Sequence, residues 1–288
     1  MKIREALGAA QSSMAAREIP DARIEAELLL MYSMGMNRVE LYTELERPLS
    51  DFDMAAYWRL VERRLRHEPA AYITQEVQFY DIDLYVDSRV LIPRPETEML
   101  VEMAVDFLSG RRPDPAVVAD VGTGSGAIAV TIARLCPTAR VYAMDISVPA
   151  LEVARLNVIK HEVQDRVRLL QGNLLDPLPE AVDLMIANLP YVSQEEFGGL
   201  MPEVRDFEPE MALNGGVDGL DIVRLLMLQA GSRLLPGGLL LAEIGQGQYE
   251  AVAALARSWF SGCSVDVFPD MAGIDRVVAI SMFPVFAG

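Results

Sequence analysis

The chain has 288 residues, of which 51% are hydrophobic and 23% are charged, and its formal net charge is −17. This composition excludes global disorder, and the strong negative charge disfavours a nucleic-acid substrate unless a local basic patch overrides it. No apolar run reaches the roughly 18 residues of a membrane span, and the polar start is unlike a signal peptide, so we expect no membrane association.

Two cysteines, Cys136 and Cys263, are too few for a disulfide framework or a metal cluster. We therefore expect reduced, buried thiols, no metal site and a cytoplasmic protein.

The first quarter of the chain, residues 1–72, is predicted to form a small helical bundle. Apolar residues recur there at helical spacing, beginning with Ile3, Ala6, Leu7 and Ala10. Two more helices are expected, each after a capping residue: Arg23 to Met34 after Asp21, and Met54 to Arg66 after Ser50 or Asp51. The pattern leaves open whether this bundle is a packed accessory domain or a module that recognises a partner.

Residues 73–91 are rich in strand-forming side chains and predict a β-hairpin connector. The segment Ile92–Glu98 follows, in which Pro93 and Pro95 stiffen an extended chain before a helix from Met99 to Leu108. Arg94 lies between these prolines, and it is either part of a capped helix entry or a lid on a ligand.

From Pro115 onward, strands and helices alternate, which predicts a Rossmann-like, doubly wound α/β sheet with helices on both faces. The predicted strands are 117–121, 141–144, 167–171, 182–187, 238–244, 263–268 and 276–282. The predicted helices between them are 127–135, 149–160, 222–234 and 249–260. The domain organisation is thus a helical domain 1–72, a connector 73–91 and an α/β domain 92–288.

A glycine-rich loop lies between the first strand of this domain and its helix, and comprises Gly122, Thr123, Gly124, Ser125 and Gly126. Its spacing is G-x-G-x-G, not the G-x-G-x-x-G typical of dinucleotide sites, and no triphosphate-binding loop is present. Asp145 ends the second strand, where a carboxylate can hold ribose hydroxyls. The loop alone would also suit a plain turn, but together with Asp145 and Asn188 it favours S-adenosylmethionine. Asn173 and the adjacent Leu174, past the third strand, are expected at the adenine, although Asn173 also suits a turn.

The stretch Asn188-Leu189-Pro190-Tyr191 follows a buried strand and would face the ligand crevice of such a sheet. The carboxamide oxygen of Asn188 and the backbone carbonyl of Leu189 can accept both N–H bonds of a planar NH2 group. Pro190 fixes the turn, and the ring of Tyr191 can lie against the flat face of that group.

These motifs resemble a class I methyltransferase that acts on planar NH2 groups. Ile92–Glu98, Val204–Pro209 with Gly215–Asp221, and Asp21–Leu30 resemble, more narrowly, the release-factor glutamine methyltransferases of the PrmC or HemK family. Three positions depart from the family pattern: Leu189 replaces a proline, Asn173 an aspartate and Gln75 a glycine.

The resemblance implies methylation of the glutamine amide nitrogen in the Gly-Gly-Gln motif of class I peptide chain release factors. S-adenosyl-L-methionine would be the cofactor and S-adenosyl-L-homocysteine the product. It implies catalytic roles for Asn188, Pro190 and Tyr191, a substrate contact at Leu189, and cofactor contacts at residues 122–126, Asp145, Asn173, Leu174, Asn188 and Arg94. We expect a monomer, no general base and no direct nucleic-acid contact.

Two alternatives remain at this stage. A nucleic-acid amino-methyltransferase acting on DNA adenine or ribosomal RNA would share the same cofactor site, and a basic groove beside Tyr191 would favour it. The one dense basic run, Arg63-Arg64-Leu65-Arg66-His67, suits a solvated helix face equally well. A noncatalytic S-adenosylmethionine-binding module is disfavoured by the intact Asn188, Pro190 and Tyr191.

Overall fold

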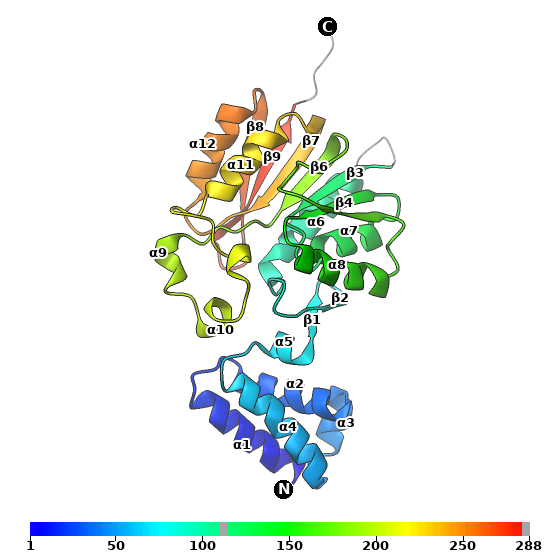
Figure 1. Ribbon diagram of the computed structural model, residues 1–288, viewed down its shortest axis with the longest axis vertical. Helices are drawn as coiled ribbons and strands as arrows, with labels where there is room; N and C mark the ends of the chain where they lie inside the picture. The colour runs from blue at the N-terminus through cyan, green and yellow to red at the C-terminus, as the bar shows by residue number, and fades with distance from the viewer. Residues whose placement is uncertain (110–114, 284–288) are drawn as a thin grey trace. The chain divides into compact units, whose positions relative to one another are not determined.

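The computed structural model describes residues 1–109 and 115–283 (Figure 1). These residues form two compact units. The first contains Met1–Glu76 together with Met201–Phe207, and the second contains Val77–Leu200 and the described residues from Glu208 onward. The boundary falls within the predicted connector 73–91, and the domain limits read from the sequence stay a prediction.

The first unit is helical. Its elements are α1 (Ile3–Ala15), α2 (Ala22–Met34), α3 (Arg38–Thr43), α4 (Asp51–Arg64), α5 (Ala70–Thr74) and the short α10 (Pro202–Arg205). Ser50 caps α4 as predicted, because its hydroxyl accepts a hydrogen bond from the Asp53 N–H at 3.1 Å. The predicted cap by Asp21 is wrong: Asp21 precedes α2 in a left-handed conformation, and its side chain makes no capping bond.

Arg64, at the end of α4, is 1% exposed and pairs with two carboxylates of the same unit. One is Glu25 on α2 and the other is Glu203 on α10, so the arginine joins the segment 201–207 to the helical bundle. The neighbouring Arg63 is 41% exposed and pairs with Glu68. The basic run is therefore not a continuous solvated face.

The predicted hairpin has the strands β1 (Glu76–Phe79) and β2 (Ile82–Tyr85), and the second unit begins within β1, at Val77. The proline segment leads into a 3-10 turn, η1 (Pro95–Thr97), and then into α6 (Glu98–Ser109). The α/β part contains α7 (Ala127–Leu135), α8 (Val148–Lys160), α9 (Gln194–Phe197), η2 (Glu210–Ala212), α11 (Asp221–Ala230) and α12 (Tyr249–Trp259). Among the described residues, no helix is both long and apolar enough to cross a membrane.

A seven-stranded sheet organises this unit, in the order β5-β4-β3-β6-β7-β9-β8. Its strands are β3 (Val117–Val121), β4 (Arg140–Asp145), β5 (Val167–Gln171), β6 (Val182–Ala187), β7 (Leu234–Glu243), β8 (Cys263–Pro269) and β9 (Asp275–Met282). Strands β3 to β7 are parallel, and β9 runs antiparallel to both of its neighbours, β7 and β8. The doubly wound architecture predicted from the sequence is confirmed.

Helices cover both faces of the sheet (Figure 1). Val121, Ala187 and Leu240 share a core with residues of α11 and α12, whereas Val118 and Leu241 share a second core with residues of α6 and α7. Strands buried on both faces read as continuous apolar runs, and this is why the sequence located them.

The predicted helix 222–234 is too long. α11 ends at Ala230, and Leu234 already belongs to β7, where it pairs with Val182 of β6. The pairing shifts register between Val182 and Leu184, so Pro236 and Gly237 fit into β7 at an irregular point of the ladder. The strand predicted from the sequence starts at residue 238 and leaves Pro236 and Gly237 outside it.

Candidate active site

The candidate site lies where β3 and β6 end side by side. β4 and β5 extend the sheet from β3 on one side, and β6 and β7 extend it on the other. Such a change in strand order opens a crevice at the carboxyl edge of the sheet. The glycine loop, residues 122–126, follows β3, and Asn188 follows β6.

The glycine loop is held in place by hydrogen bonds to Asp120, whose side chain is buried, with 1% of the residue exposed. Its Oδ2 accepts hydrogen bonds from the Thr123 hydroxyl at 2.6 Å and the Ala129 N–H at 3.1 Å. Its Oδ1 has no partner among the described residues. Burial raises the pKa of Asp120 to about 7, and the nearby charge of Asp145 adds to this rise.

Gly122 lets this loop approach the chain that leaves β6. Its φ is +76°, and a Cβ there would lie 2.9 Å from Leu189 Cδ2. A side chain at this position would therefore separate the two loops. Leu189 itself is buried in the core that contains Val121 and Ile244. The leucine that departs from the family pattern thus packs against the glycine that faces it.

Asp145, at the end of β4, holds the glycine loop from the side. Its Oδ2 accepts the Gly124 N–H at 2.9 Å, and its Oδ1 accepts the Ser147 N–H at 2.9 Å. Burial raises the pKa of Asp145, while these backbone donors oppose the rise. A carboxylate has about four acceptor sites, so Asp145 retains acceptor capacity for a ligand.

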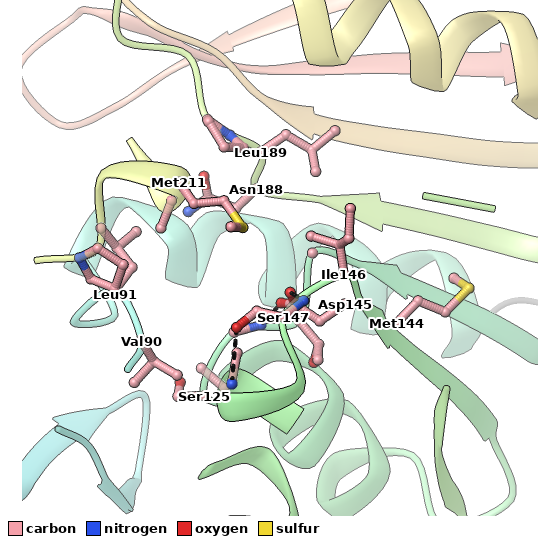
Figure 2. Close-up of a pocket in the computed structure, with 18 of the residues that line it drawn as sticks. Val90, Leu91, Ser125, Met144, Asp145, Ile146, Ser147, Asn188, Leu189 and Met211 are labelled. Carbon is pink, nitrogen blue, oxygen red and sulfur yellow. Dashed lines mark hydrogen bonds between the residues drawn. The ribbon is translucent and has the colours of Figure 1, made fainter. Parts of the chain in front are cut away.

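A cavity of about 430 Å³ lies between these elements, within the size range of small-molecule sites. Its walls include most of the cofactor residues predicted from the sequence: Gly122, Thr123, Gly124, Ser125, Asp145, Asn173, Leu174 and Asn188. Figure 2 shows Asn188 and Met211 on one side of the cavity, and Asp145, Ser147 and Ser125 on the other. One cavity therefore joins the predicted cofactor residues to the predicted substrate residue Asn188.

Asn188 is held by a chain of hydrogen bonds on one side of its carboxamide. Its Nδ2 donates to Thr97 Oγ1 at 2.9 Å, and the Thr97 hydroxyl donates to Glu243 Oε2 at 2.7 Å. The hydroxyl of Tyr191 donates to the other oxygen of Glu243 at 3.2 Å. No hydrogen bond from a described residue reaches Asn188 Oδ1, which remains available as an acceptor beside the cavity.

The backbone at Tyr191 is fixed by contacts with Gln248 and Gly219. The Gln248 side chain donates from Nε2 to the Tyr191 carbonyl at 3.0 Å and accepts the Gly245 N–H at 2.8 Å. Gly219, with φ +75°, lies so close that a Cβ would be 2.2 Å from the Tyr191 oxygen. The glycine-rich segment 215–221 therefore packs directly on the predicted substrate loop.

Three predicted site residues do not line the cavity: Arg94, Gly126 and Tyr191. Arg94 pairs with the buried carboxylate of Glu208, which also accepts the Ile92 N–H at 3.3 Å. Gly126 precedes α7, and a Cβ there would lie 3.3 Å from Ala154 Cβ, so it permits close packing of helices. Cofactor contacts of Arg94 and Gly126, and stacking by Tyr191, stay predictions.

Asn173 both borders the cavity and takes part in a turn, the two roles that the sequence suggested for it. It lines the cavity, and its carbonyl also accepts the Asp176 N–H at 3.1 Å, as in a turn. Leu174, beside it, has φ +50° and is buried against the cavity.

The sequence reading missed two polar groups and several apolar walls of the site. The polar groups are Thr97 and Glu243, and the apolar walls include Val90, Leu91, Ile146 and Met211. Glu243 could have been found from its place, since it ends an apolar strand whose Ala242 pairs with Ala187, the residue before Asn188. Met211 could not be found in the same way. Its place at the cavity depends on how the loop around it folds, and no local sequence pattern indicates that fold.

Comparison with known proteins gives matches over most of the chain. Residues 5–74 match the family model described as the PrmC N-terminal domain, and residues 97–201 match the methyltransferase small domain. A release factor glutamine methyltransferase of Moorella thermoacetica is 42% identical, over 96% of this chain and 97% of that protein. One of Geobacter sulfurreducens is 40% identical, over 96% and 95% respectively.

The solved structures agree on the fold. A methyltransferase from Pyrococcus furiosus superposes with a TM-score of 0.51 at 18% identity, and the match covers 71% of this chain and 90% of that one. The two relatives are 42% and 40% identical to this chain over nearly its full length, and family models match residues 5–74 and 97–201. The chain therefore belongs to the release factor glutamine methyltransferase family and is a protein-glutamine N-methyltransferase.

Proposed function

We propose that the protein methylates the side-chain amide nitrogen of the glutamine in the Gly-Gly-Gln motif of class I peptide release factors, using S-adenosylmethionine. One observation carries the proposal. The Asn188 carboxamide borders the same cavity as Asp145 and the glycine loop, with its nitrogen held by Thr97 and its oxygen left as an acceptor. The names of the relatives, which span nearly the whole chain, support the release factor as substrate.

The cavity residues suit S-adenosylmethionine. Asp145 offers carboxylate lone pairs to ribose hydroxyls, and Asn173 with the apolar Leu174 and Ile146 suits an adenine ring. Gly124, beside which a Cβ would meet nothing within 4 Å, leaves open space above the glycine loop. When bound, the cofactor supplies a methyl group on a positively charged sulfur.

The residues after β6 can help an unreactive amide nitrogen to accept a methyl group. An amide nitrogen is a poor nucleophile, because its lone pair is delocalised into the carbonyl. Asn188 Oδ1 and the Leu189 carbonyl would accept the two N–H groups and so orient the nitrogen. Such positioning contributes several kcal/mol, and roughly 7–11 kcal/mol in ideal cases. After methyl transfer the cationic amide loses one proton to water, so no side chain is required as a general base.

The surroundings of the cavity favour a protein substrate over a nucleic acid. Among the described residues that line it, Arg89 is the one basic side chain, and it is paired with Asp87 and Glu152. A phosphate backbone needs unpaired cations along its path.

The test is incubation of the protein with methyl-labelled S-adenosylmethionine and a purified class I release factor. Release factor whose motif glutamine is replaced by alanine, ribosomal RNA and duplex DNA serve as parallel controls. The proposal predicts label only in the unaltered release factor, at the motif glutamine in a peptide digest. Label in RNA or DNA, or in the glutamine-free release factor, would refute it.

A further inference from the structure

The hydrogen bonds behind Asn188 come from three elements that meet at the carboxyl edge of the sheet. Thr97 ends η1, Asn188 follows β6, and Glu243 ends β7. Thr97 is 4% exposed and Glu243 is 2% exposed, so solvent does not compete for their bonds. A buried chain of this kind is selective about the direction of each bond.

The direction follows from counting protons. Thr97 has one hydroxyl proton, and it is donated to Glu243 at 2.7 Å. The remaining lone pairs of Thr97 can only accept, so the group facing them must be a donor. Asn188 satisfies this with Nδ2 at 2.9 Å. With its carboxamide turned over, two oxygens would face each other without a proton between them, which disfavours that orientation roughly 5- to 150-fold.

Glu243 accepts one hydroxyl at each of its oxygens, from Thr97 at 2.7 Å and from Tyr191 at 3.2 Å, and this arrangement maintains the direction. Burial raises its pKa, and the hydroxyls of Thr97 and Tyr191, followed by the charge of Arg276, oppose the rise. Since both oxygens of Glu243 accept a hydroxyl proton, the proton of Thr97 is committed to Glu243 and is not available to Asn188.

We propose that Thr97 and Glu243 are positioning residues that fix the orientation of the Asn188 carboxamide, so that its oxygen faces the substrate. This inference rests on the proposed function, in which the target is itself a carboxamide. A turned Asn188 would present NH2 to the NH2 of the target glutamine, and two donors cannot bond. The orientation of one side chain therefore decides whether the site accepts the glutamine.

The kinetic test uses Thr97→Val, which replaces the hydroxyl by a methyl group of similar size, and Thr97→Ser, which restores the hydroxyl. Thr131→Val is the matched control, because Thr131 is also buried but, among the residues that the structure describes, its hydroxyl bonds only the Ala127 carbonyl of its own helix. We expect Thr97→Val to lower kcat for the release factor 10- to 100-fold, with cofactor Kd changed less than about two-fold. Thr97→Ser and Thr131→Val should stay near wild type. Wild-type kcat in Thr97→Val, or equal loss in the valine and serine variants, would overturn the proposal.

A second readout does not depend on activity. The chain has five asparagines, so protein labelled with 15N only in asparagine side chains gives few NH2 signals, and loss of one in Asn188→Ala identifies Asn188. We expect the Asn188 protons to exchange slowly with solvent in the wild type and at least ten-fold faster in Thr97→Val. Unchanged exchange would overturn the inference. Absence of methyl transfer by the wild type would instead refute the proposed function.

Discussion

Asp120 couples the stability of the second unit to pH. It is a fully buried carboxyl group with a pKa raised from 3.8 to about 7. In the unfolded chain it loses its proton near pH 3.8, whereas in the folded protein it keeps the proton to about pH 7. The folded state binds more protons than the unfolded chain in this window. The stabilisation that comes from Asp120 is therefore fully present below pH 3.8 and is lost as the pH rises towards 7.

The size of this effect follows from the shift. One pKa unit corresponds to 1.36 kcal/mol, so a rise from 3.8 to about 7 amounts to about 4 kcal/mol in total. Between about pH 5 and pH 8, the loss is about 3 kcal/mol. Asp120→Asn removes this titration and retains an oxygen for Thr123 and Ala129. We expect the variant to lose about 3 kcal/mol less than the wild type over this range.

The assay is urea unfolding at pH 5, 6, 7 and 8 in a Trp58→Phe background. The chain has two tryptophans, so the fluorescence then reports Trp259 in the second unit alone. Asp266→Asn, at an exposed position on β8, is the control for the change in net charge. Parallel pH curves for the wild type and Asp120→Asn would refute the reasoning.

Two further substitutions, each with a matched control, test the close packing at Gly219 and the buried ion pairs of Arg64. Gly219→Ala should lower unfolding free energy by roughly 1–3 kcal/mol and reduce turnover, because its Cβ would lie 2.2 Å from the Tyr191 oxygen. Gly273→Ala, at a similar φ with nothing within 4 Å, should cost about 1 kcal/mol, and equal losses in urea unfolding would contradict this account. Arg64→Ala should destabilise the first unit by roughly 3–5 kcal/mol, as it leaves two carboxylates unpaired, one of them on α10. Arg63→Ala, on the same helix, should change stability by about 0–1 kcal/mol, and similar values for both variants by Trp58 fluorescence would exclude a buried ion pair.

Most of the fold could be predicted because the second unit buries its strands on both faces. The largely apolar runs 117–121 and 182–187, each of which contains one aspartate, match β3 and β6 at both ends. The error at β7 has a tertiary cause. Pro236 and Gly237 favour a turn locally, but the pairing of Leu234 with Val182 begins the strand before them.

The parts of the site that lie in short sequence motifs could be predicted from the sequence. The glycine loop, Asp145 and Asn188 each follow a strand, and parallel strands bring their carboxyl ends to one edge. The direct partner of Asn188, Thr97, was not predictable in this way, since it lies 91 residues before Asn188 in the chain. Arg94 shows the same limit, because its pairing with Glu208, 114 residues away, depends on how two loops pack.

The most direct measurement is the single-turnover rate of methyl transfer to the release factor glutamine by Asn188→Ala, at saturating cofactor and substrate. If the Asn188 oxygen holds the target amide, the rate should fall on the order of 10²- to 10³-fold, as for a lost transition-state hydrogen bond. The far-UV circular dichroism spectrum of the variant should match that of the wild type, as expected if the helices and strands are retained. A rate within about two-fold of the wild type would contradict the account, since the target nitrogen would then be positioned by other groups.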